Sequence, residues 1–295
     1  MAVFKLRVDP SDVKQIFIKA DIDVHCCRYW KLSKWEYNDL SFSFWRIYYN
    51  SVAGACINFQ GKTSELDASK ILLIPPCTAY STSLLKNSSE GLIGSRIETL
   101  NELNDLQGKG MVDHFFIHFN LGIRLDYVKP NIYVFETDKK LLQLIADLQK
   151  YTIEQLVLFD NLYTIKLYAL IFNLLSKVDA QFWKQRTNDP RVLKVIDYID
   201  RNYHKELNNS SLGVIANMAT NSFLRLFKQS MGHTIQQYIQ KVRINKAILQ
   251  MHNASESIES IAEKCGFSDR HHFSKVFKKE TGMPPAAYRQ QKMYF

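Results

Sequence analysis

Short apolar stretches separated by turn residues fill the first 130 residues of the chain. Apolar positions there alternate with polar ones or run for four or five residues, as in 71–74 and 115–119. Seven of the eleven glycines lie between Gly54 and Gly122. Short strands separated by Gly, Asn and Ser turns are typical of a β-sandwich or barrel. The pattern therefore predicts a β-domain over residues 1–135.

The spacing of apolar positions changes after residue 131. No Gly or Pro occurs between Asn131 and Asp189, and apolar residues recur there at the three- and four-residue steps of amphipathic helices. These positions are Leu141, Leu142, Ile145, Leu148, Leu162, Ile165, Leu170, Phe172 and Leu175. Residues 136–183 are therefore predicted to be a helical segment that mediates dimerisation, with packing on its own β-domain as the alternative.

A polar stretch, Lys184–Asn188, precedes the last third of the chain and is predicted to be a linker. Asp189 and Pro190 follow it as an N-cap and a first helical residue. No proline then occurs before Pro284, and the apolar pattern stays helical. Residues 184–295 are expected to form a separate helical domain.

Composition is compatible with a cytoplasmic protein of two or more domains. The chain has 295 residues, of which 46% are hydrophobic, and its longest apolar runs are far shorter than the ~20 residues of a membrane span. Its five cysteines show neither C-x-x-C pairs nor zinc-site spacing. We therefore expect reduced thiols and no membrane partner.

The net charge of +9 is concentrated at one end. Residues 189–295 carry 16 Lys and Arg against 9 Asp and Glu, a net +7, whereas the rest of the chain carries +2. A basic terminal domain favours a polyanionic partner, although a solvated lysine-rich face would give the same count.

An internal repeat decides between these two interpretations. Six residues, Phe223, Arg225, Phe227, Lys228, Gly232 and Tyr238, recur 50 positions later as Phe273, Lys275, Phe277, Lys278, Gly282 and Tyr288. Upstream, Ile215-Ala216 matches Ile261-Ala262 at an offset of 46. Each unit is a short helix, a turn and a second helix, which is the helix-turn-helix pattern. In the second unit we expect Ser257 to cap the first helix, Gly266 to make the left-handed turn, and Ser268 or Asp269 to cap the next helix.

The repeat and its flanking residues resemble the AraC/XylS family of bacterial transcription regulators. The matching positions are Ile261-Ala262, Gly266-Phe267, Asp269, Phe273, Phe277-Lys278, Gly282, Pro285 and Tyr288-Arg289, together with a connecting helix around Arg243, Ala247 and Leu249. The resemblance covers about residues 190–290. It implies two helix-turn-helix units joined by a central helix, with recognition helices that enter successive major-groove segments.

The first unit departs from this pattern. Only eleven positions separate Ala216 from Phe227, whereas fifteen separate Ala262 from Phe277. The first turn is therefore expected to be about three residues short, which would change the angle of its recognition helix.

Exposed positions of the two recognition helices are the candidate DNA contacts. In the first unit they are Asn221, Leu224, Arg225 and Lys228, and in the second Arg270, His271, Ser274, Lys275 and Lys278. We expect Arg225 and Lys275 to contact bases, and Lys228 and Lys278, later on their helices, to contact phosphates. His272 could contact DNA or only pack.

The same resemblance implies an N-terminal jelly-roll, or cupin-like, domain that binds a small-molecule effector such as a sugar. Alternation places Arg46 and Tyr48 on one face of their strand and Trp45 and Tyr49 on the other. Arg46, Tyr48 and His118 are the candidate effector-binding residues.

A metal-dependent enzyme is the main alternative for such a domain. His114 and His118 are four residues apart, about 13 Å along a strand, which is too far for them to share a metal. No catalytic motif stands out, so we expect neither a metal nor another cofactor.

The sequence thus predicts an α+β multidomain regulator: a jelly-roll sensor, a helical dimerisation segment and an all-α domain with two helix-turn-helix units. Its expected partners are double-stranded DNA half-sites, the effector, RNA polymerase and a second copy of the chain. A jelly-roll enzyme with an appended DNA-binding module and an architectural DNA binder are the alternatives. Activation and repression are both left open.

Overall fold

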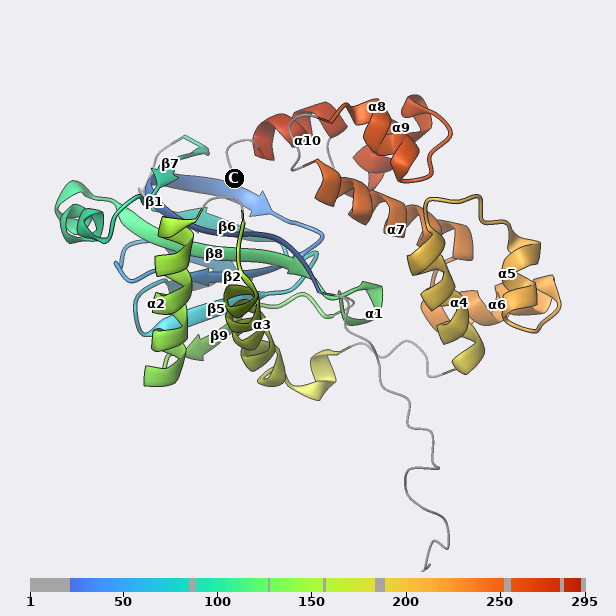
Figure 1. Cartoon of the computed structure of the whole chain (residues 1–295), viewed down its shortest axis with the longest axis horizontal. Helices are drawn as coiled ribbons and strands as arrows, with labels where there is room; N and C mark the ends of the chain where they lie inside the picture. Colours follow the sequence, from blue (N-terminus) through green and yellow to red (C-terminus); the bar gives the residue numbers. More distant parts are fainter. Residues whose placement is uncertain are drawn as a thin grey trace, which may run out of the picture.

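An antiparallel β-sheet is followed by a series of helices in the computed structural model of the chain (Figure 1). The structure describes residues 22–84, 89–126, 128–155, 158–183, 189–251, 256–281 and 284–292. The predicted linker at 184–188 and the motif glycine Gly282 lie outside these residues. The predicted fold class, a curled β-domain followed by an all-α region, is confirmed.

Nine strands in the described part of the chain form one antiparallel sheet. They are β1 (Asp23–Leu40), β2 (Trp45–Tyr49), β3 (Cys56–Phe59), β4 (Lys62–Glu65), β5 (Lys70–Ile74), β6 (Tyr80–Ser83), β7 (Gly91–Arg96), β8 (Val112–Asn120) and β9 (Tyr133–Glu136). Their order is β4-β3-β6-β1-β8-β2-β5-β9, and β7 pairs with β1 beside this path. The long β1 pairs with β8, β7 and β6 along its length, and three register shifts bend it, so the sheet curls.

The central strands of the sheet are buried on both faces because different elements cover each one. Helices α2 (Lys139–Glu154) and α3 (Asn161–Ser176) pack on the face that carries Trp45, Ile47 and Tyr49. Tyr48 and Phe116 belong to a second core on the opposite face, which we call the inner face. Every residue of β2 and β8 is consequently buried, and the predicted alternation along 45–49 is confirmed.

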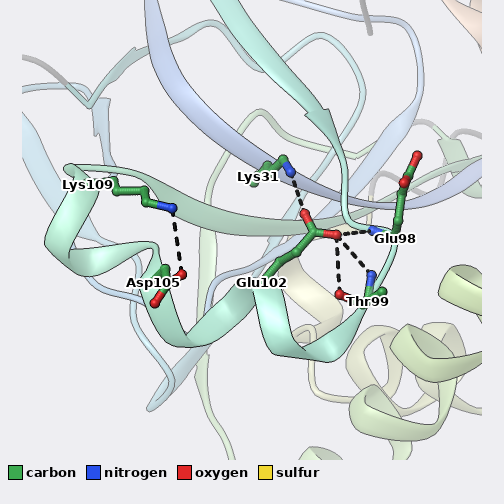
Figure 2. Close-up of polar contacts among 6 residues, drawn as sticks. All are labelled: Lys31, Glu98, Thr99, Glu102, Asp105 and Lys109. Carbon is green, nitrogen blue, oxygen red and sulfur yellow. Dashed lines mark hydrogen bonds and ion pairs between the residues drawn. The ribbon is translucent and has the colours of Figure 1, made fainter.

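A short helical excursion joins β7 to β8, and one carboxylate holds it in place (Figure 2). It comprises the 3₁₀ helices η2 (Leu100–Asp105) and η3 (Gln107–Lys109). Glu102 accepts hydrogen bonds from the backbone N–H groups of Glu98 and Thr99, each at 3.0 Å, and forms an ion pair with Lys31 of β1. Lys31 holds the pKa of the Glu102 carboxyl below its usual range, so this tie to the sheet is between charged groups.

Seven helices of the described C-terminal residues form two small cores that share one long helix. They are α4 (Pro190–Asn202), α5 (Asn209–Ile215), α6 (Thr220–Met231), α7 (Ile235–Gln250), α8 (Ile258–Lys264), α9 (Arg270–Thr281) and α10 (Pro285–Lys292). The first half of α7 contributes Tyr238 and Val242 to the core of α4, α5 and α6. Its second half contributes Ile244 and Ile248 to the core of α8, α9 and α10.

The β-domain also contacts the second of these cores. Phe44, in the loop before β2, is 1% exposed and belongs to the same apolar cluster as Ile248 and Tyr288, with Phe42 packed beside it. An ion pair of 2.6 Å between Asp23 of β1 and Lys246 of α7 lies at the same junction. The shorter elements α1 (Ile123–Asp126) and η4 (Ala180–Phe182) complete the described chain.

His114 of β8 should make the protein sensitive to acid. Its ring is buried on the inner face, its Nδ1 lies 2.8 Å from Asn50 Oδ1, and burial lowers its pKa to about 3. Below pH 6.5 the unfolded chain binds a proton that the folded His114 does not, so stability is lost as the pH falls from 6.5 towards 3. The loss should be about 1 kcal/mol per pH unit in this range.

Urea unfolding at pH 7.5 and pH 5 measures this loss, with His114→Gln as the comparison. The variant should lose about 1–2 kcal/mol less than the wild type between the two pH values, because its side chain does not titrate. Equal losses in both proteins would contradict the assignment.

Candidate nucleic-acid interface and ligand pocket

The two helix-turn-helix units have the same turn geometry. In each unit, the third residue from the end of the first helix has a backbone carbonyl that accepts a hydrogen bond from the N–H five residues later. Met218 N donates to Gly213 O, and Phe267 N donates to Ala262 O, both at 3.0 Å. Asn217 (φ 52°) and Gly266 (φ 83°) take the left-handed conformation that closes this kind of helix end. The predicted role of Gly266 is confirmed.

This geometry corrects the alignment of the repeat. The first helix and turn of the two units match at an offset of 49, so Leu212 and Gly213 correspond to Ile261 and Ala262, and all four are buried. The predicted equivalence of Ile215-Ala216 with Ile261-Ala262 is therefore wrong. Ile215-Ala216 lies at the end of α5, one helical turn after Leu212-Gly213. Because the two pairs are similar residues on the same side of the helix, the wrong pair was matched to Ile261-Ala262.

The first turn is shorter than the second by one residue. Residues 216–219 join α5 to α6, and residues 265–269 join α8 to α9. The expectation of a turn about three residues short is wrong, because it rested on the mistaken equivalence. Gly213 provides the space for the tighter connection: a Cβ atom there would lie 3.1 Å from Thr220 Cα and 3.2 Å from Met218 O.

Basic residues form one face on each recognition helix. Asn221, Arg225 and Lys228 of α6 are exposed on the side opposite Phe223 and Phe227, which are fully buried. On α9, Arg270, His271, Lys275 and Lys278 are exposed in the same way opposite Phe273 and Phe277. Arg225 and Lys275 occupy equivalent positions 50 residues apart, as do Lys228 and Lys278.

These basic side chains form no ion pair with another described residue. Other cations in the same domain do, since Arg191 pairs with Asp189 and Lys246 with Asp23. A cation without a local counter-charge can neutralise a phosphate or donate to a base edge without first breaking a bond.

Three predicted positions have additional contacts. Leu224 is half-buried and packs on the first core, and Ser274 is also half-buried. The His272 ring packs edge-on against Phe267 at 5.6 Å between centroids, which favours the packing alternative for this residue. Asp269 caps α9, since its Oδ1 accepts from His272 N at 2.7 Å.

Arg243 of α7 has a role that the sequence did not suggest. Its Nε donates to Tyr203 O and its Nη2 to Lys205 O, both at 2.8 Å, while its guanidinium lies 5.9 Å from the ring of Phe267. It thus joins the end of α4 in the first unit to the turn of the second. Gly266 leaves room for this contact, because a Cβ there would lie 2.9 Å from Tyr203 O.

A pocket opens on the inner face of the sheet. Its lining residues are Trp30, Leu32, Trp35, Tyr48, Leu92, His114, Phe116 and His118. The free space that they surround is about 20 Å³, room for about one water molecule, and it opens to solvent on one side. Tyr48 and His118, two of the three predicted effector-binding residues, line the pocket.

Arg46, the third predicted residue, lies behind the pocket wall and is fully buried. Its Nη1 donates to Tyr80 Oη at 3.1 Å, and its Nη2 donates to Pro75 O at 3.3 Å. The rings of Phe42 and Tyr80 lie 4.9 and 4.8 Å from its guanidinium carbon. Arg46 therefore does not line the pocket and is separated from it by neighbouring side chains.

The two histidines of the pocket are separated by an aromatic ring. The centroid of Phe116 lies 5.3 Å from that of His114 and 5.2 Å from that of His118. Across the part of the chain that the structure describes, no three His, Cys, Asp or Glu side chains come close enough together to hold a metal. No helix within the same residues has the length and apolar character needed to cross a membrane.

Comparison with known proteins identifies the C-terminal domain. A family model described as "Helix-turn-helix domain" matches residues 212–291. The chain is 27% identical over 174 residues, 58% of its length, to the HTH-type transcriptional activator RhaS of Mannheimia succiniciproducens, and 43% identical over 74 residues, 25% of its length, to the activator RhaR of the same organism. These matches span 63% and 27% of the two relatives, less than two thirds of either.

The fold as a whole is also found in a solved structure. ToxT from Vibrio cholerae O395 is 14% identical, has a TM-score of 0.50, and aligns with 90% of this chain and 97% of its own. At this identity the likeness concerns the fold alone.

The close approach at Gly213 gives a test of the first unit. Replacing a helical Gly by Ala ordinarily stabilises a protein by up to about 1 kcal/mol. Gly213→Ala should instead destabilise by about 1–2 kcal/mol, because the new Cβ meets backbone atoms of the turn and of α6. Gly108→Ala is the matched control, since a Cβ there has no atom within 4 Å. Chemical unfolding measures both, and a stabilised Gly213→Ala would show that α5 and α6 lie further apart.

Proposed function

We propose, on the premise that residues 212–291 form a helix-turn-helix domain of the AraC/XylS type, that the chain is a sequence-specific DNA-binding regulator of transcription. The matched relatives bear the names of transcriptional activators, so we class the chain with non-enzymatic regulators and favour activation. We place it in the cytoplasm, where its DNA target lies.

The observation that carries this proposal is the pair of matching basic faces on α6 and α9. Each face lies opposite a buried aromatic pair on the second helix of its unit and forms no ion pair with the described residues around it. We assign base contacts to Asn221, Arg225, Arg270 and Lys275, and phosphate contacts to Lys228 and Lys278. His271, Ser274 and Leu224 are assigned to the groove-facing surface beside them.

We further propose that the regulator is a homodimer that associates through α3. One side of α3 packs on the sheet, but Leu162, Ile165 and Phe172 on its other side are 53%, 64% and 46% exposed. With Ala169 they follow a spacing of three, four and three residues, which is the a/d spacing of a coiled coil. A second copy of α3 offers the same stripe, as a two-fold interface requires.

The effector would act through the contact between the two domains. His118 lines the pocket, its ring lies 4.8 Å from Phe44 at the centroids, and Phe44 is buried in the core of the second helix-turn-helix unit. A ligand that moves His118 would therefore move an anchor of the DNA-binding domain. We propose that this changes the placement of the two DNA-binding domains in the dimer, and hence their half-sites and their contact with RNA polymerase.

Two lysines of α9 test the DNA-binding assignment. After selection of preferred sites from a random DNA pool, Lys275→Ala should relax specificity at one base position. Lys278→Ala should weaken binding about equally for all sequences and reduce the slope of log K against log salt by about one. Fluorescence anisotropy across a salt series measures both effects. Lys150→Ala, on α2 of the β-domain, is the control and should change neither; wild-type behaviour of both α9 variants would refute the assignment.

The exposed stripe of α3 tests the dimer. Ile165→Glu places a charge at its centre and should convert the dimer to a monomer in analytical ultracentrifugation. Affinity for a DNA fragment with two half-sites should fall by about a hundredfold or more, because the second contact is no longer intramolecular. Ile93→Glu, at a position that is 59% exposed on β7, should leave the dimer intact. A dimeric Ile165→Glu protein would place the interface elsewhere.

A further inference from the structure

The two helix-turn-helix units meet at the middle of α7. Tyr238 and Val242 belong to the core of the first unit, whereas Ile244 and Ile248 belong to the core of the second. The two cores have no residue in common. Arg243 lies between Val242 and Ile244, where α7 leaves one core and enters the other. A rotation of one unit relative to the other would therefore take place about this part of α7.

Arg243 binds the first unit at the end of α4. Tyr203 is the C-cap residue of that helix, and the last backbone carbonyls of a helix have no partner within it. Arg243 Nε donates to Tyr203 O, and Arg243 Nη2 donates to Lys205 O, both at 2.8 Å. A guanidinium holds its donors in one plane at fixed angles, so bonds to two carbonyls fix the direction of α4 as well as its distance from α7. Hydrogen bonds from a charged donor are also about twice as strong as neutral ones.

The turn of the second unit packs against the same side chain. The guanidinium carbon of Arg243 lies 5.9 Å from the centroid of the Phe267 ring. A Cβ atom at Gly266 would lie 3.0 Å from both Cζ and Nε of Arg243 and 2.9 Å from Tyr203 O. The backbone of the turn thus approaches both the guanidinium and the carbonyl that it binds. One side chain therefore holds the end of α4 against the turn that precedes α9.

The β-domain is attached to the second unit. Phe44 belongs to the core of that unit, and Asp23 pairs with Lys246 in the second half of α7. Among the described residues, the core of the first unit contains no residue of the β-domain. The placement of the first unit relative to the rest of the chain therefore depends on α7 and on Arg243.

We propose that Arg243 is a positioning residue that sets the angle between the two recognition helices, and hence the number of base pairs between their subsites on DNA. A subsite is the stretch of base pairs that one recognition helix contacts. One added base pair moves a subsite by about 3.4 Å and turns it by about 35°, since B-DNA has about 10–10.5 base pairs per turn. Two helices held at a fixed angle cannot both follow this displacement. This proposal rests on the proposed DNA-binding function and names a residue that determines specificity through the placement of other residues.

DNA sites of altered length test the proposal. Selection from a random DNA pool with the full chain first locates the two subsites, which are the positions where Arg225→Ala and Lys275→Ala relax the selected sequence. Fragments with one selected site, or with the same site lengthened or shortened by one base pair between the subsites, are then titrated by fluorescence anisotropy. The ratio of the affinities for the unaltered and the altered site is the spacing penalty.

Wild-type protein should show a spacing penalty of about tenfold or more, since one unit loses its base contacts on the altered site. Arg243→Ala should reduce the penalty to about threefold or less and should weaken binding to the unaltered site, since the two units are no longer held in register before they bind. Arg243→Lys keeps the charge but cannot bridge two carbonyls in one plane, so its penalty should lie between these values. Arg201→Ala removes an exposed arginine from the last turn of α4 and should retain the wild-type penalty.

Circular dichroism melts show which variants fold, and Arg243→Lys carries the test if Arg243→Ala does not fold. A folded Arg243 variant that keeps the wild-type penalty would overturn the proposal, even if it binds both sites more weakly, because an equal loss on both sites indicates a purely structural role. Equal binding of all site lengths by the wild type would overturn it as well. Failure of the wild type to select any sequence would instead refute the proposed regulator.

Discussion

The arrangement of the C-terminal domain depends on the burial of two successive stretches of one helix. The first half of α7 completes the core under α6, and the second half completes the core under α9. Because a helix is stiff over sixteen residues, each recognition helix is fixed relative to the other through it. Arg243 strengthens this link by joining the end of α4 to the turn of the second unit. Neither recognition helix can turn without disturbing a core that contains α7.

The β-domain follows a different constraint, since its central strands have no solvent-facing side. Helices α2 and α3 take one face, and the curl of the sheet encloses the other. Polar groups on the inner face must therefore be satisfied within it. The contacts of His114 with Asn50 and of Arg46 with Tyr80 show how this is achieved. The Nε of Arg46 and the Nδ2 of Asn50 are exceptions, since neither has a hydrogen-bond partner among the described residues.

Local patterns were sufficient to predict much of this fold. The period of apolar residues gave the strand and helix regions, Asp189-Pro190 the start of α4, and Ser257 the cap of α8. The repeat located both recognition helices but misaligned the helices before them. Ile215-Ala216 resembles Ile261-Ala262 in sequence, but the structural match is Leu212-Gly213, one turn earlier on the same side of α5. Alternation placed Arg46 on the inner face. Its complete burial depends on the rings of Phe42 and Tyr80, which lie outside β2 and pack against its guanidinium. The contact of Phe44 with α7 has no local signal at all.

The tighter turn at Gly213 means that the two helix-turn-helix units of one chain are not copies of each other. Their connections differ by a residue, and the pair that packs behind the turn is Leu-Gly in one and Ile-Ala in the other. A chain with two unlike helix-turn-helix units in a fixed order has a polarity. If both units lie in the major groove, each site for one chain has a direction along the duplex. Reversing that site relative to a promoter then reverses which unit lies nearer the start of transcription.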